Sequence, residues 1–79
     1  MEFEILLNKV EDVKRFVELA RNVDGDINVA HDKYVVDGKS LLGLMSLDLS
    51  KPIKVTVISD NDYGFSEFMV NCVSWIVGK

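Results

Sequence analysis

The spacing of apolar residues switches repeatedly along this chain, and this switching constrains the fold more than any other feature. Residues 2–7 and 53–59 contain alternating apolar and polar side chains, the two-residue period of a strand with one buried face. Residues 8–23 and 65–77 instead carry apolar side chains three and four positions apart, the period of an amphipathic helix. The sequence therefore predicts a fold in which helices and strands share one core.

Two shorter strands and a third helix are predicted between these segments. Residues 26–31 and 33–37 are β-prone runs on either side of Asp32, which is typical of a hairpin. Gly38 breaks the second run, and a helix capped by Ser40 or its neighbour is expected through about Leu49.

The order is thus strand, helix, strand, strand, helix, strand, helix. Strands with one apolar face and helices with one apolar stripe require two layers, so we expect an α+β fold with a four-stranded sheet covered on one face by three helices. With 79 residues the chain predicts a single domain, 1–79, too small for a deep internal active site. The open face of the sheet should carry polar side chains: Glu2, Glu4, Asn28, Lys54 and Thr56.

Local signals mark the expected helix ends. Asn8 and Glu11 resemble a capping box at the start of the first helix, and Gly25 follows its predicted end. Asp62 or Ser66 would cap the last helix.

Charge and cysteine content exclude several function classes. The chain has 13 acidic and 9 basic residues, a net charge of -4, which argues against a nucleic-acid binder with a clustered basic face. The single Cys72 lies on the apolar stripe of the last helix, where we expect a core residue; it allows no internal disulfide and no cysteine metal site. We expect a cytoplasmic protein without metal or cofactor, since the sequence has no signal peptide and no membrane span.

The segment "GKSLLGLMSLDLSKPIKVTVIS" resembles the HPr family, the histidine-containing phosphocarriers of the bacterial sugar phosphotransferase system. The similarity is strongest at Lys39-Ser40-Leu41 and at residues 43–47, and the element order is also that of the family. The resemblance implies an open-faced β-sandwich of order βαββαβα with an antiparallel sheet.

The resemblance breaks at the family's active site, which lies at the start of the first helix. Lys9 falls in the position of the phosphorylated histidine, Glu11 in that of an arginine and Asp12 in that of a proline. A lysine at neutral pH is an ammonium without a free lone pair, and two carboxylates would repel a phosphoryl group. We therefore expect no catalytic residue and no enzymatic activity. His31, the only histidine, is predicted to be a solvent-facing turn residue and not a substitute nucleophile.

A second functional position of the family is retained at Ser40. In Gram-positive members the serine at this position is phosphorylated by an ATP-dependent HPr kinase, and the product binds a transcriptional regulator in carbon catabolite repression. The resemblance thus makes Ser40 a candidate regulatory phosphorylation site, with Lys39 beside it. The alternative is that Ser40 is only a helix cap.

The leucines that follow Ser40 have two interpretations. The resemblance implies that Leu41, Leu42 and Met45 form an exposed patch with Lys39 and Ser40 that binds protein partners: an HPr kinase-like enzyme, a transcriptional regulator or a phosphotransferase-system component. The alternative is that all of the leucines belong to the core.

Three functions remain open from the sequence. The first is a non-enzymatic regulatory HPr relative, resembling the catabolite-repression paralogues that lack the active histidine. The second is a phosphocarrier working through a non-standard residue. The third is an HPr-fold scaffold with an unrelated partner.

Overall fold

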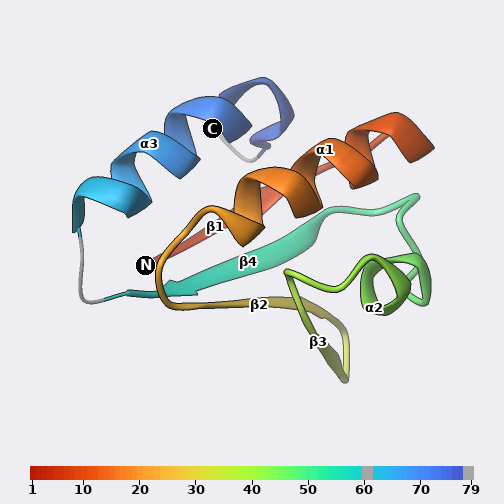
Figure 1. The fold of residues 1–79 in the computed structure, drawn as a ribbon. Helices are drawn as coiled ribbons and strands as arrows, with labels where there is room; N and C mark the ends of the chain where they lie inside the picture. Colours follow the sequence, from red (N-terminus) through yellow and green to blue (C-terminus); the bar gives the residue numbers. More distant parts are fainter. Residues whose placement is uncertain (60–61, 78–79) are drawn as a thin grey trace.

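The computed structural model describes residues 1–59 and 62–77, with side chains throughout except at 62–64. Four strands and three helices alternate in the predicted order (Figure 1). The elements are β1 (Glu2–Ile5), α1 (Val10–Arg21), β2 (Asp26–His31), β3 (Tyr34–Asp37), α2 (Leu41–Met45), β4 (Ile53–Ile58) and α3 (Asp62–Cys72), followed by a 3-10 turn, Val73–Trp75.

The strands form one antiparallel sheet in the order β1-β4-β2-β3. Its register aligns Glu2 with Thr56, Thr56 with Asn28, and Asn28 with Asp37, so these four side chains share one face. Helices α1 and α3 cover the other face, and α2 packs beside β3 and α1 (Figure 1). The predicted fold class and the polar open face are therefore confirmed.

The core lies between the sheet and the helices. Phe16 is fully buried at its centre, with its ring centroid 5.6 Å from that of Phe68 and 6.4 Å from that of Trp75. The strands contribute their alternate residues to the same core: Phe3, Ile5, Ile27, Val29, Ile53, Val55 and Val57. Cys72 belongs to this core too, as predicted.

Helix α1 does not begin with the predicted capping box. Its N-cap is Lys9, whose side chain makes no capping hydrogen bond. Asp12, not Glu11, reaches back, and its Oδ2 accepts the Asn8 amide at 3.3 Å. Both carboxylates lie in the first turn, where they are favoured by the positive end of the helix dipole.

The end of α1 also comes earlier than Gly25. The C-cap is Asn22, and the chain then turns so that Gly25 adopts a φ of 130°. A Cβ on Gly25 would lie 2.4 Å from the Ile58 carbonyl oxygen, so glycine serves the turn into β2 and not the helix stop.

Helix α2 is half as long as predicted, because it ends at Met45 and not near residue 49. The Ser46 hydroxyl donates to the Gly43 carbonyl at 2.6 Å, and the Leu47 amide bonds to Leu44 in a tighter turn at 3.1 Å. Serine side chains that bond to nearby backbone in this way compete with helix continuation.

The last helix changes its period before it ends. After Cys72 the chain tightens into the 3-10 turn, which buries Trp75 and leaves Val73 53% exposed, against the expectation that Val73 is in the stripe. Ser66 lies inside α3 and Asp62 is its first residue, so neither is the N-cap; the preceding position 61 lies outside the described residues. Within the described part of the chain, no helix has the length and hydropathy needed to cross a membrane.

We predict that Phe16→Ala lowers the free energy of unfolding by about 3–5 kcal/mol, because it opens a cavity where three aromatic rings meet. Urea denaturation followed by circular dichroism measures this loss. The matched control is Val70→Ala on α3, where the side chain is 70% exposed and the change should stay within about 0.5 kcal/mol. Equal losses in the two variants would contradict the assignment of Phe16 to the centre of the core.

Candidate functional site

Ser40 is the N-cap of α2, as predicted. Its backbone is extended, and its Oγ accepts the Gly43 amide at 3.1 Å while its own amide donates to the Asp37 carbonyl at 3.0 Å. The side chain is half-buried. The hydroxyl therefore lies where backbone N–H groups at the start of a helix favour negative charge.

Lys39 is expected beside Ser40 as a partner-binding cation, but its side chain is hydrogen-bonded within the fold. Its Nζ donates to the Val23 carbonyl at 2.7 Å, and its amide donates to Asp37 Oδ1 at 2.9 Å. Its carbonyl accepts Arg21 Nε at 3.2 Å. These bonds tie the β3–α2 loop to the end of α1, so Lys39 positions Ser40 from within the fold.

The apolar residues of α2 divide between core and surface. Leu44 is fully buried and Leu41 is half-buried, whereas Leu42 is 85% and Met45 47% exposed. The alternative that the whole segment belongs to the core is thus wrong for Leu42 and Met45. Leu42 has the largest exposed fraction among the large exposed apolar side chains of the described residues.

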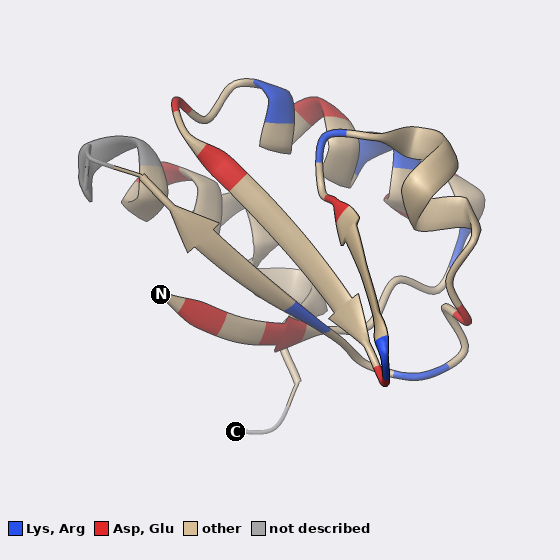
Figure 2. Cartoon of the chain, turned by 90° about the horizontal axis from the view of Figure 1, so that it is seen from below, with Lys and Arg blue, Asp and Glu red and all other residues tan. Residues whose placement is uncertain are grey.

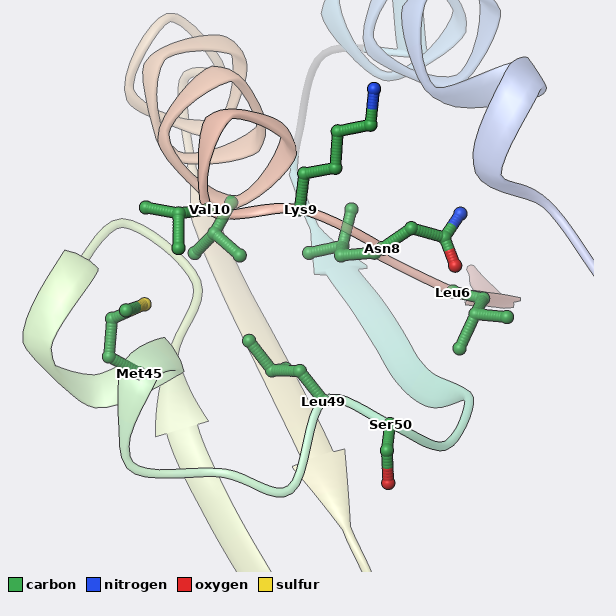
Figure 3. Close-up of a pocket in the computed structure, with 9 residues that line it drawn as sticks. Leu6, Asn8, Lys9, Val10, Met45, Leu49 and Ser50 are labelled. Carbon is green, nitrogen blue, oxygen red and sulfur yellow. The ribbon is translucent and has the colours of Figure 1, made fainter.

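A groove of about 330 Å³ separates the start of α1 from the end of α2. Its lining residues come from the β1–α1 loop, α1, α2 and the α2–β4 loop: Leu6, Leu7, Asn8, Lys9, Val10, Val13, Met45, Leu49 and Ser50. Figure 3 shows Val10, Met45 and Leu49 converging on the groove, while the Lys9 side chain points away from Met45 and Leu49. The groove therefore has apolar walls, and the position expected for the family's nucleophile lies at its rim.

The loop that forms the lower wall of the groove is held by Asp48. Its Oδ1 accepts both the Ser50 hydroxyl at 2.6 Å and the Ser50 amide at 3.1 Å. These hydrogen bonds favour the carboxylate and hold the pKa of Asp48 below its ordinary value.

Neither His31 nor Cys72 forms a reactive centre. His31 ends β2 with its side chain only 14% exposed and its Nε2 3.5 Å from Asp32 Oδ2, so the expected solvent-facing turn histidine is wrong. Burial raises the pKa of the Cys72 thiol to about 12, which keeps it protonated and unreactive. Among the described residues no three acidic, histidine or cysteine side chains cluster as metal ligands.

Acidic side chains predominate on β1, whereas acidic and basic side chains alternate on α1. Seen from below in Figure 2, red stretches mark β1 and the start of β2, α1 carries both red and blue stretches, and blue stretches lie on β4 and on the loop that enters α2. Arg21 at the end of α1 donates a hydrogen bond to the Lys39 carbonyl in the loop that enters α2. Sequence reasoning missed Arg21, because nothing in the local pattern indicates that the end of α1 meets the start of α2.

The comparisons with known proteins agree with this architecture. Residues 12–63 match the family described as "PTS HPr component phosphorylation site". This match covers more than half of the chain but begins after Lys9. Comparison with curated protein sequences gives no significant match.

Two solved structures have the same fold. HPr-C-His from Thermoanaerobacter tengcongensis superposes with a TM-score of 0.76 at 23% identity, covering 94% of this chain and 92% of that one. The phosphocarrier protein HPr of Bacillus anthracis str. Ames gives a TM-score of 0.65 at 20% identity, over 91% and 95% of the two chains. With the family match to residues 12–63, the fold and the sequence together place this chain in the HPr family of the phosphotransferase system.

Proposed function

We propose that this chain is a regulatory, protein-binding HPr domain, 1–79, that is not an enzyme and acts through the surface of α2. Its binding patch comprises Leu41, Leu42 and Met45, and Ser40 is its phosphorylation site. The observation that carries the proposal is the 85% exposure of Leu42, two residues after the serine that caps the same helix. Leu42 is not isolated, because Met45 on the same short helix is also 47% exposed, and neighbouring exposed apolar side chains are typical of a contact surface.

Phosphorylation of Ser40 would change this surface without unfolding it. A phosphoserine adds about -1.5 to -2 charges and three acceptor oxygens. The Gly43 amide already donates to Ser40 Oγ at 3.1 Å, so it could donate to the phosphate instead. Arg21, held at the neighbouring Lys39 carbonyl, supplies a nearby cation. The modified surface would present an apolar patch next to an anion, which suits a partner with an arginine beside an apolar pocket.

The residues at the start of α1 support the proposal that the chain has no phosphocarrier activity. Lys9 is its N-cap, and an ammonium cannot serve as the nucleophile that a neutral imidazole provides. Glu11 and Asp12 occupy the first turn, where they would repel an incoming phosphoryl group. His31 is no substitute, because its side chain is 14% exposed at the end of β2 and not at a helix start.

The partners that fit this role are a kinase of the HPr kinase type, a transcriptional regulator and components of the phosphotransferase system. The setting is then carbon catabolite control in the bacterial cytoplasm. The proposed function involves no binding to nucleic acid or to a membrane, in agreement with the net charge of -4.

We predict that incubation with ATP and an HPr kinase transfers one phosphate to Ser40, seen by intact-mass and fragment mass spectrometry. Ser40→Ala should abolish the transfer, whereas Ser46→Ala, at the exposed C-cap of the same helix, should leave it intact. Ser40→Ala removes a cap worth about 1 kcal/mol, so its melting curve must show that it is folded at the assay temperature.

Absence of phosphate on Ser40 in the folded protein would remove the regulatory switch from the proposal. Incubation of the protein with phosphoenolpyruvate and Enzyme I tests the alternative, phosphocarrier activity. An acid-labile phosphate that forms on the parent chain but not on His31→Gln would show a phosphocarrier and contradict the proposed role.

We further predict that Leu42→Ser lowers kcat/KM of the kinase for this protein by about tenfold, which is the effect expected if Leu42 is one of the few central residues that dominate the binding energy of an interface. Val70→Ser on α3 is the matched control, because the Val70 side chain is exposed too, at 70%, but lies on another helix. Equal values of kcat/KM for the two variants would contradict a docking role for α2.

A further inference from the structure

Two basic side chains lie beside Ser40, and the fold uses them differently. Lys39 Nζ donates to the Val23 carbonyl at 2.7 Å, just beyond the end of α1. Arg21 is exposed, and its Nε donates at 3.2 Å to the Lys39 carbonyl, which is bonded directly to the Ser40 amide nitrogen. Within the described residues the Arg21 guanidinium makes no other hydrogen bond or ion pair, so the N–H groups of both its Nη atoms are available.

We propose that, once Ser40 is phosphorylated, Arg21 binds the phosphate within the same chain and clamps the start of α2 to the end of α1. This inference rests on the proposed function, because it requires a phosphate on Ser40. In that transfer Ser40 Oγ forms the bond to the γ-phosphorus of ATP, ADP leaves, and the hydroxyl proton is released. An arginine donates through two parallel N–H groups to two phosphate oxygens, so the third oxygen stays available to a partner protein.

The surroundings of Ser40 oppose a phosphate that has no cation beside it. The C-terminal end of α1, whose carbonyl groups carry partial negative charge, lies against the loop that enters α2 (Figure 1). Asp37 adds a carboxylate, because its Oδ1 accepts the Lys39 amide at 2.9 Å. Both would repel a phosphoserine of about -1.5 to -2 charges. Since the Lys39 ammonium is already bonded to Val23, Arg21 is the basic group, among the described residues at this junction, that can offset the repulsion.

The absence of a side chain at Gly43 leaves room for the phosphate. A Cβ at this position would lie 3.3 Å from Ser40 Oγ and 3.3 Å from Val36 Cβ, which is tighter than ordinary contact. The Gly43 amide donates to Ser40 Oγ at 3.1 Å. The phosphate would therefore be held from two elements, by the Gly43 amide of α2 and by Arg21 of α1. Such a clamp fixes the exposed patch of α2 before a partner arrives, and a fixed patch lowers the cost of ordering on binding.

The test uses a chain in which phosphoserine is incorporated at position 40 during synthesis, so it needs no kinase. Phosphorus-31 NMR over a series of pH values measures the pKa of the phosphate, which is about 6 in a free phosphoserine. A bound guanidinium stabilises the dianion, so we expect this pKa in the parent sequence to lie about 1 pH unit below that in Arg21→Gln. Arg15→Gln is the matched control and should keep the parent pKa. It removes the same charge from an exposed position of α1 that makes no hydrogen bond to the loop.

Hydrogen exchange distinguishes a clamp from a general effect of charge. Phosphate on the parent should slow exchange of the Ser40 and Gly43 amides by about tenfold, because the loop opens only after charge-assisted hydrogen bonds break. This slowing should be lost in Arg21→Gln. Arg21→Lys keeps the charge but not the planar pair of donors, so it should restore part of the pKa difference without the slowing.

Two outcomes would overturn the proposal: the same phosphate pKa in the parent and in folded Arg21→Gln, or an equal rise of the pKa in Arg15→Gln. If Arg21→Gln does not fold by circular dichroism, the phosphorylated parent decides. Its phosphate pKa should then be near 5, and a value at or above about 6 would show that no cation is bound. Failure of an HPr kinase to modify Ser40 would contradict the proposed function and leave these measurements unchanged, so the two claims fail separately.

Discussion

The contact of Phe16 with Phe68 and Trp75 is the interaction on which the rest of the structure depends. It joins α1, α3 and the C-terminal turn above one face of the sheet, and Phe16 is fully buried at their meeting point. Aromatic side chains bury a large area each, which a domain of 79 residues needs because its core is small. Fixing α1 in this way also fixes both of its ends, and each end contributes to the candidate site.

The C-terminal end of α1 meets the loop that enters α2. Lys39 bonds to the Val23 carbonyl, and Arg21 bonds to the Lys39 carbonyl, so Ser40 and the start of α2 are held by the helix that the core anchors. The five residues of α2 could not form a stable helix alone. Its buried Leu44 and these loop bonds keep it in place, which leaves Leu42 free to face outward.

Most of the fold could be predicted from the sequence because burial is periodic. Ile53, Val55 and Val57 are buried while Lys54 is exposed, as their alternation indicates, and the order of all seven elements follows from such patterns. The site was harder to predict, because the exposure of each side chain on α2 depends on which face of the helix packs against the core. No local rule separates Leu42 from Leu44, and the length of α2 depends on the Ser46 hydroxyl bonding to Gly43. The contact of Arg21 with Lys39 spans 18 positions and leaves no local signal at all.

The groove and the exposed part of α2 meet at Met45, which lines the groove and is 47% exposed. Leu42 lies on the same helix but does not line the groove. A partner that contacts Leu42 alone would therefore be insensitive to substitutions at the start of α1, whereas a partner that also fills the groove would contact Val10 and Leu49 as well.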